Sequence, residues 1–206
     1  MTRVLIFDTE TTGLPEKYAS IRDYEKWPYI TQLSYIIYDL SNNSIHTISD
    51  NYIKIDKSIN ISEESEKITG ISREILNDKG IHIKQALHDF NNALKASDII
   101  VGHNVSFDKQ IVMVECFRNR INNNFVKFHG KNIIRKPEYC TCKKSSHLFN
   151  NRYQKLENLY SNLFNEKPSG LHNSLMDTIV TFRCYYKLAH NKDIYLTNPE
   201  ILNYIK

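Results

Sequence analysis

The sequence predicts an α/β protein in which helices pack on the faces of a layered sheet. Three observations support this prediction. A short continuous apolar run at 4–7 is typical of a strand that is buried on both faces. Two segments rich in Ile, Thr and Tyr follow it. Beyond about residue 62 the apolar residues instead recur three or four positions apart, which is typical of helices.

The length and composition of the chain favour one compact domain. The chain has 206 residues, and domains commonly hold about 150, so we expect a single domain spanning 1–206. It is 41% hydrophobic and 24% charged, which excludes collagen-like and largely disordered classes. No apolar run approaches the roughly 18 residues of a membrane-spanning helix, and the first residues run directly into a predicted strand. We therefore expect an intracellular protein, cytoplasmic or nuclear and not secreted, with no membrane partner.

The first three strands are expected to follow one another along the chain. The first covers about 3–10, and the next two cover 29–39 and 44–55, both rich in β-branched and aromatic residues. The polar cluster 41–43 between the last two favours a tight turn. These two segments are therefore expected to form a hairpin that continues the sheet.

Helices and further strands are expected to alternate in the rest of the chain, because the apolar period changes from two to about 3.6 and back. The apolar segment 98–102 between two helical patterns is the clearest further strand. The predicted helices lie within 62–78 and at 83–94, 107–121, 153–164 and 173–190.

The four cysteines are expected to be reduced thiols. Cys140 and Cys142 form the only close pair, and one residue separates them where zinc sites usually have two to four. This spacing predicts neither a structural metal nor a disulfide.

Positive charge is concentrated in one part of the chain. The net charge is +4, yet between residues 118 and 155 ten basic residues face a single acid, Glu138. Two interpretations remain open, a solvated loop and a face that contacts phosphates. The ten are Arg118, Arg120, Lys127, Lys131, Arg135, Lys136, Lys143, Lys144, Arg152 and Lys155.

A first candidate motif stands at the end of the first strand. Asp8 and Glu10 alternate with Thr9, so both carboxylates project from the same face, about 7 Å apart along the chain. Two carboxylates in apolar surroundings repel one another unless they share a cation, and hard oxygen ligands suit Mg²⁺ or Mn²⁺. The alternative is a strand that simply emerges into water at this point.

A second motif follows the predicted strand 98–102. Asp108 falls in the first turn of the next helix, where the helix dipole favours an anion. His103 and Asn104 are polar groups in the same turn, at the strand end where α/β sheets usually collect ligands. An ordinary acid at a helix N-terminus is the alternative interpretation.

A third motif consists of His172 and Asp177. A five-residue offset within one helix rotates about 140° around the axis, so the two side chains converge only if His172 lies in the preceding loop. A loop imidazole with a pKa of about 6.5 is suited to removing a proton from water. A surface histidine beside a solvated aspartate is the alternative.

Taken together, the three motifs resemble those of the DEDDh 3′-5′ exonucleases, the group that includes the proofreading epsilon subunit of bacterial replicases and ribonuclease T. The resemblance covers most of the chain, since segments 67–71, 139–141 and 155–159 also resemble parts of that family. It implies a ribonuclease H-like fold, a mixed five-stranded sheet flanked by helices in a three-layer α/β/α arrangement.

The resemblance also implies the chemistry of the site. In this family four carboxylates hold two divalent ions, Mg²⁺ or Mn²⁺, and a histidine acts as general base, which suits in-line hydrolysis of a terminal phosphodiester. The implied metal ligands are Asp8, Glu10, Asp108 and Asp177, with His172 as the base. All five are the implied catalytic residues.

Five further residues are implied to line the pocket for the terminal nucleotides, with the leucine as an apolar wedge beside the bases. They are Thr11, Leu14, Ile68, Asn104 and Phe107. The Asp-Thr-Glu-Thr-Thr-Gly form of the first motif, 8–13, resembles the replicative proofreading branch and favours DNA over RNA as the nucleic-acid partner. No visible motif encodes a polymerase or repair partner.

Two alternatives stay open at this point. The first is an exoribonuclease that trims RNA 3′ ends, because the group that would sense a 2′-hydroxyl is not identifiable in the sequence. The second is a nucleic-acid-binding scaffold that has lost activity, which would need a hidden defect because every chemical position holds the expected residue type.

Overall fold

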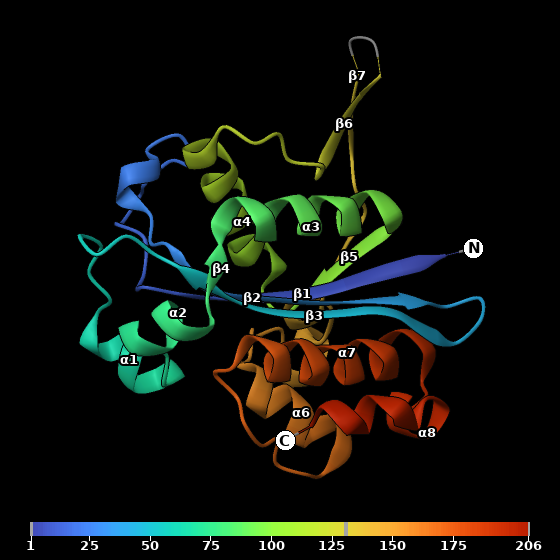
Figure 1. The fold of residues 1–206 in the computed structure, drawn as a ribbon. Coiled ribbons are helices and arrows are strands. Elements are labelled where there is room, and N and C mark those ends of the chain that lie inside the picture. Colours follow the sequence, from blue (N-terminus) through green and yellow to red (C-terminus); the bar gives the residue numbers. More distant parts are fainter. Residues whose placement is uncertain (1, 130–131, 206) are drawn as a thin grey trace.

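The computed structural model describes residues 2–129 and 132–205 and is built around one mixed sheet with helices on both faces (Figure 1). The strands of this sheet are β1 (Arg3–Thr11), β2 (Ile30–Asp39), β3 (Ser44–Lys54), β4 (Ile81–His82), β5 (Ile99–Gly102) and β8 (Glu138–Cys140). Their order in space is β4-β3-β2-β1-β5-β8. The predicted three-layer α/β architecture is confirmed.

The pairing of the strands places the carboxyl ends of β1, β5 and β8 at the same end of the sheet. β1 pairs antiparallel with β2, and β2 with β3, so the hairpin expected around 41–43 is present. β5 lies parallel to β1, and β8 lies parallel to β5. The loops that follow β1, β5 and β8 therefore leave the sheet on the same side.

The sheet has one strand more than the five that the resemblance implied. The additional strand is β4, which pairs with Ile53 and Lys54 of β3. With two residues it is too short to show a period of two in the sequence.

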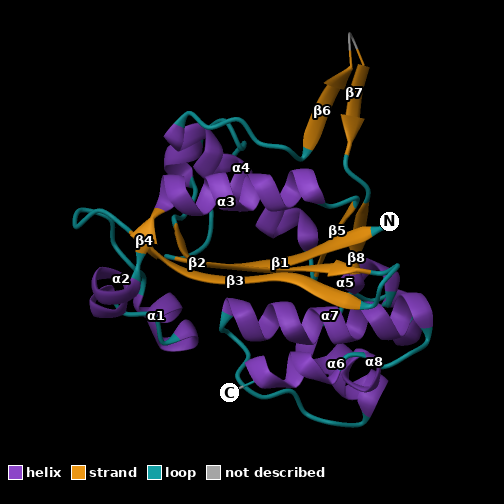
Figure 2. Ribbon diagram, turned by 45° about the vertical axis from the view of Figure 1, so that its right-hand side comes forward, coloured by secondary structure: helices purple, strands orange, loops and turns teal. Residues whose placement is uncertain are grey.

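A second, separate sheet was not predicted at all. It is the hairpin of β6 (Val126–His129) and β7 (Asn132–Arg135), which projects away from the rest of the fold (Figure 2). Its pairing is local and involves four residues on each side, embedded in a segment rich in Asn and Lys. Lys131, one of the ten basic residues named above, lies outside the described residues.

Helices cover the sheet on both faces and bury alternate residues of β1. Leu5 and Phe7 belong to the core on the side of α3 (Ile83–Ala96) and α4 (Val105–Asn119). Val4 belongs to the core on the side of α7 (Ser174–His190), which runs across the other face (Figure 1). The helices α6 (Leu156–Phe164) and α8 (Ile194–Thr197) lie beyond it. β1 is thus buried on both faces, as its apolar sequence predicts.

The helical segment 62–78 is divided in two by a glycine. α1 (Glu63–Thr69) ends at Gly70, which adopts a left-handed conformation with φ of 69° and closes the helix through its N–H. α2 (Arg73–Lys79) then begins at Ser72, whose side chain caps it. The remaining elements are η1 (Tyr24–Lys26), α5 (Thr141–Lys144), η2 (Ser146–Phe149) and η3 (Pro199–Tyr204).

The four cysteines are all buried and free of disulfides, as predicted. Within residues 2–129 and 132–205, no helix combines the length and the apolar character that crossing a bilayer requires.

Candidate active site

The first two candidate carboxylates lie side by side with polar residues of the neighbouring strand. Asp8 is paired with Ser34 of β2, and Glu10 with Gln32. Both acids are half-buried, whereas Ser34 and Gln32 are fully buried. This end of the sheet is therefore polar on the face that α7 covers, although the strands are apolar further along.

Three carboxylates converge at this point. One oxygen atom each from Asp8, Glu10 and Asp177 lies within 4.8 Å of the other two. Asp177 comes from the first turn of α7, about 170 residues along the chain from β1. Oxygen atoms this close are spaced for one hard divalent cation between them.

The fourth carboxylate, Asp108, lies nearby but outside this group. It is buried at 4% exposure in the first turn of α4, and its Oδ1 accepts hydrogen bonds from the backbone N–H of Thr9 at 3.1 Å and from the Thr9 hydroxyl at 2.8 Å. Because Thr9 alternates with Asp8 and Glu10, Asp108 approaches β1 from the opposite helix layer. The sequence places all four acids at this edge of the sheet, and the structure brings three of them into contact range of one cation.

Burial raises the pKa values of all four acids, and neighbouring carboxylates add to the rise for Asp8, Glu10 and Asp108. Burial raises the pKa of Glu10 to about 8, and the charges of Asp177 and Asp108 add to the rise. Burial likewise raises the pKa of Asp8 well above its usual range, together with the charges of Asp108, Asp177 and Glu10. Burial also raises the pKa of Asp108 and of Asp177 to about 7 in each case. Holding these carboxylates ionised at neutral pH is therefore costly without a compensating positive charge.

A buried hydrogen-bond network fixes the N-terminus of α7 against β1 and β2. The hydroxyl of Ser174 donates to the carbonyl of Asp8 at 2.6 Å and accepts the N–H of Ser34 at 3.1 Å. The side-chain carbonyl of Gln32 accepts the N–H of Ser174 at 3.1 Å, while its amide donates to Asp50 at 2.7 Å. Asp177 follows within the same turn, so this network sets the position of its carboxylate.

His172 lies in the loop before α7, as the spacing of the third motif predicts. Its side chain is exposed, and its backbone has a φ of 66°. Its backbone N–H donates to Oδ2 of Asp177 at 3.0 Å. The backbone is therefore tied to the carboxylate cluster, while the imidazole makes no hydrogen bond to any described residue and remains available to a ligand.

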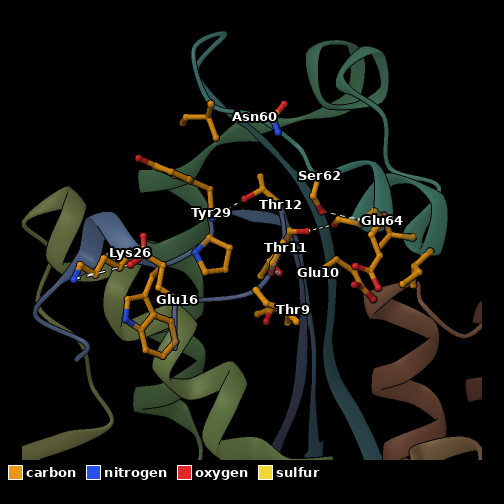
Figure 3. Close-up of a pocket in the computed structure, with 18 of the residues that line it drawn as sticks. Thr9, Glu10, Thr11, Thr12, Glu16, Lys26, Tyr29, Asn60, Ser62 and Glu64 are labelled. Atoms are coloured by element: carbon orange, nitrogen blue, oxygen red, sulfur yellow. Dashed lines mark hydrogen bonds and ion pairs between the residues drawn. The ribbon is translucent and has the colours of Figure 1, made fainter. Parts of the chain in front are cut away.

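A cavity of about 890 Å³ is lined by one of the candidate carboxylates, Glu10 (Figure 3). It lies between the end of β1, the segment 25–29 and helix α1. Four of the five residues predicted to contact substrate line it, namely Thr11, Leu14, Ile68 and Phe107. The fifth, Asn104, is exposed and is not among the lining residues; it adopts a left-handed conformation with φ of 65° immediately before α4.

Apolar and acidic groups share the wall of this cavity. Leu14 is 82% exposed and Ile68 is 48% exposed, so both present open apolar surface to whatever enters. The charged lining residues are Glu10, Glu16, Glu25, Glu64 and Lys26. The single lysine lies 4.0 Å from Glu16. An anionic ligand therefore meets net negative charge here unless cations are bound as well.

The segment 25–29 is held in place by a buried ion pair on α4. Arg118 pairs with Glu115 at 2.8 Å, and both side chains are nearly inaccessible to solvent. The guanidinium also donates to the carbonyls of Tyr24, Trp27 and Pro28. Arg118 is therefore a structural residue of the cavity wall, so the interpretation of the basic stretch as a phosphate-contacting face is wrong for its first member.

Several residues that position the site were not identified from the sequence. Ser174, Gln32, Ser34 and the pair of Glu115 and Arg118 make contacts with partners 85 to 166 residues away, which no local pattern reveals. One signal was present: Gln32 and Ser34 interrupt an otherwise apolar strand at alternate positions, on the face that Asp8 and Glu10 share.

Comparison by sequence family gives one clear result. The model of the RNase_T family, described as an exonuclease family, matches residues 5–185. A comparison with curated proteins gives no match.

Two solved structures with the same fold are nucleases. E. coli exonuclease I in complex with a dT13 oligonucleotide superposes with a TM-score of 0.69 and 17% identity over 100% of this chain and 43% of that one. The nuclease domain of 3′hExo, a DEDDh family member bound to rAMP, gives a TM-score of 0.66 and 12% identity over 93% of this chain and 94% of that one. The chain thus spans less than half of the exonuclease I chain, and at these identities the similarity shows the fold.

Proposed function

Because this chain belongs to the RNase_T exonuclease family, we propose that it hydrolyses the terminal phosphodiester of single-stranded or frayed DNA 3′ ends and releases nucleoside 5′-monophosphates. The observation that carries the proposal is the convergence of Asp8, Glu10 and Asp177, with one oxygen of each within 4.8 Å of the others. Glu10 also lines a cavity that is large enough for a nucleotide and carries exposed apolar side chains.

Two divalent ions, Mg²⁺ or Mn²⁺, are part of this proposal. The oxygen ligands of Asp8, Glu10 and Asp177 fit one such ion, and the raised pKa values of these acids support the fit, since a bound cation removes the cost of their ionisation. Asp108 would contribute to the second ion from the side of α4. When bound, such ions stabilise the charge that develops on the phosphate and favour ionisation of a water molecule.

His172 is proposed as the general base. Its imidazole is exposed beside the carboxylate cluster and is free of hydrogen bonds to described residues. An imidazole accepts a proton from water near neutral pH. The bond from its backbone N–H to Asp177 would keep the ring next to the site while the side chain moves a proton.

The cavity is proposed to hold the terminal nucleotides. Leu14 would lie against the bases, with Ile68 and Phe107 completing an apolar surface and Thr11 at its edge. The net negative wall described above supports a role for divalent ions in admitting a phosphate here. Asn104 lies outside this lining, and its proposed contact with substrate would need the strand to extend past the cavity.

Two observations bear on whether the nucleic acid is DNA or RNA. The form of the 8–13 motif favours DNA, and exonuclease I was solved with an oligodeoxynucleotide. The nuclease domain of 3′hExo was solved with rAMP on the same fold, so an exoribonuclease is the second candidate.

A labelling experiment tests the proposal. A 5′-labelled single-stranded oligonucleotide, made as DNA and as RNA of one sequence, is incubated with the protein and Mg²⁺ or Mn²⁺, in parallel with the Asp8→Asn variant. A ladder that shortens from the 3′ end on DNA and is absent with the variant supports the proposal. A ladder mainly on RNA favours the second candidate, and no ladder on either points to an inactive scaffold.

A further inference from the structure

The loop between β8 and α6, residues 141–155, carries positive charge with no acid of its own. No aspartate or glutamate occurs between Glu138 and Glu157. Glu138 is already paired with Lys109. The loop contains α5 and η2, and we call it the anchored loop. Its basic residues are Lys143, Lys144, Arg152 and Lys155.

The cations of the anchored loop are exposed and without acidic partners. All four side chains are accessible to solvent, and none forms an ion pair with a described residue. The ammonium of Lys144 lies 5.8 Å from the centroid of the Tyr139 ring and makes a cation–π contact there instead of an ion pair. By contrast, Arg118 at the start of the basic stretch forms a buried ion pair with Glu115 and is therefore not available to a ligand.

An exposed aromatic side chain lies among these cations. Tyr153 is 66% exposed and stands between Arg152 and Lys155 in the sequence. A tyrosine ring that is open to solvent beside positive charges offers the two contacts that a single strand of nucleic acid makes, phosphate to cation and base to ring.

His103 fixes the anchored loop beside the candidate active site. Its Nδ1 lies 2.9 Å from the hydroxyl of Thr141, and its Nε2 donates to the carbonyl of Gln154 at 2.9 Å, so one imidazole holds both ends of the loop. The thiol of Cys142 donates to the same carbonyl at 3.5 Å. His103 follows β5 directly and stands five residues before Asp108.

The anchored loop and the cavity lie on opposite sides of the carboxylate cluster, at the end of the sheet where β1, β5 and β8 terminate. The cavity adjoins the end of β1 on the side of η1 and α1, whereas the loop adjoins the ends of β5 and β8. A strand whose 3′ end occupies the cavity could leave the carboxylates over this loop.

We propose that the anchored loop is a binding surface for the single-stranded nucleic acid upstream of the terminal nucleotides, with Lys143, Lys144, Arg152 and Lys155 contacting phosphates and Tyr153 stacking on a base. This surface rests on the proposed function, because it binds the remainder of the same substrate. His103 acts as a positioning residue that holds the surface next to the site.

The test measures binding and turnover separately. Binding of a 5′-fluorescein dT12 oligonucleotide is followed by anisotropy in EDTA across a salt series, for the intact protein and for the variant K143A/K144A/R152A/K155A. The matched control is K79A/K84A/K95A/K192A, which removes the same charge from other exposed positions. We expect the loop variant to bind at least tenfold more weakly and to lose about 3 from the slope of log K against log salt, while the control changes by much less.

The tyrosine is tested on its own. Tyr153→Ala should weaken binding about fivefold or more, whereas Tyr153→Phe, which keeps the ring, should bind as the intact protein does. Unchanged affinity and salt slope in the quadruple loop variant, or an equal loss in the lysine control, would overturn the proposal.

Turnover separates this proposal from the proposed function. In Mg²⁺ the loop variant should lose kcat/KM on the dodecamer by about tenfold or more and keep it on the dinucleotide dTpdT, which is too short to reach the loop. An equal loss on both substrates would contradict the proposed surface. Absence of turnover by the intact protein on every substrate would contradict the exonuclease instead, and the anisotropy series would still decide whether the loop binds a strand.

Discussion

Ser174 joins the helix that carries Asp177 to the strand that carries Asp8, through a hydrogen bond of 2.6 Å from its hydroxyl to the backbone carbonyl of Asp8. The same hydroxyl accepts the N–H of Ser34. The carboxylate cluster therefore depends on a buried side chain that carries no charge and is not among the residues that line the cavity beside Glu10.

Replacement of Ser174 by Ala should separate positioning from chemistry. It leaves the N–H of Ser34 and the carbonyl of Asp8 without this partner, which costs about 1–3 kcal/mol of the free energy of unfolding. We expect a lower Tm together with a reduced kcat, because Asp177 moves relative to Asp8. Thr178→Val is the control, since Thr178 lies one turn further along α7 and makes only a long bond of 3.4 Å to Ser34. Equal activity in the two variants would show that the Ser174 bond does not position the cluster.

Replacement of Asp8 by Asn should remove the response to metal. In the absence of divalent ions the variant should unfold at the same or a higher temperature, because one of the mutually repelling carboxylates is gone. Addition of Mn²⁺ should raise the Tm of the intact protein and not that of the variant. Asp78→Asn, at an exposed position of α2, is the matched control and should keep the response. Retention of both activity and the Mn²⁺ shift in Asp8→Asn would contradict the metal assignment.

Replacement of His172 by Asn should lower the rate and spare metal binding. Asparagine tolerates the left-handed backbone of this position and preserves the bond from its N–H to Asp177, but it cannot take a proton near neutral pH. We expect kcat to fall by roughly two orders of magnitude or more, with the Mn²⁺-induced rise in Tm unchanged. Loss of that rise would identify His172 as a metal ligand instead.

The free energy of unfolding should depend on pH in the absence of divalent ions and depend on it much less when they are bound. Folding raises the pKa of Glu10 from its usual 4.5 to about 8, and raises those of Asp108 and Asp177 from 3.8 to about 7. Between these limits the folded protein binds more protons than the unfolded chain, so the free energy of unfolding falls as pH rises from about 4 to about 8. Denaturant titrations in EDTA should show this decline, and saturating Mg²⁺ should flatten it. A decline of equal size with and without Mg²⁺ would contradict the shared cation site.

Replacement of Arg118 by Met should loosen the cavity wall. It removes the bonds to the carbonyls of segment 24–28 and leaves Glu115 buried without its partner, which costs about 3–5 kcal/mol. We expect a lower Tm and a higher KM. The double variant Arg118→Met with Glu115→Gln should recover part of the Tm but not the KM, and Arg120→Ala at an exposed position should change neither. Recovery of both quantities in the double variant would show that the wall does not depend on Arg118.

The sequence predicted most of the fold because its signals are local. The apolar run of β1, the hairpin of β2 and β3, and the helical periods of α3 and α7 each lie within one short window. β4 was not predicted because two residues are too few to establish a period. The β6–β7 hairpin was not predicted because its two short strands lie in a segment rich in Asn and Lys, without the continuous apolar run that identifies β5.

The acids and the histidine of the candidate site could be predicted from the sequence, whereas the contacts that position them could not. The acids and His172 occur in motifs, each with a fixed spacing to a strand or helix end, so their approximate meeting place follows from the parallel strands. The bond of Asp108 to Thr9, and the network around Gln32, depend on which face of a strand meets which helix. That relationship is set by packing across more than 90 residues of chain, and no single motif contains it.

The placement of α7 has a consequence for how the protein matures. The helix packs on the face of the sheet that carries Val4 and also delivers Asp177, so closing this core and completing the site are one event. The partners Ser174 and Asp8 are 166 residues apart, and contacts across such separations slow folding because a long loop must be closed to make them. The carboxylate cluster of a chain emerging from the ribosome therefore stays incomplete until Asp177 and the helix around it have been synthesised.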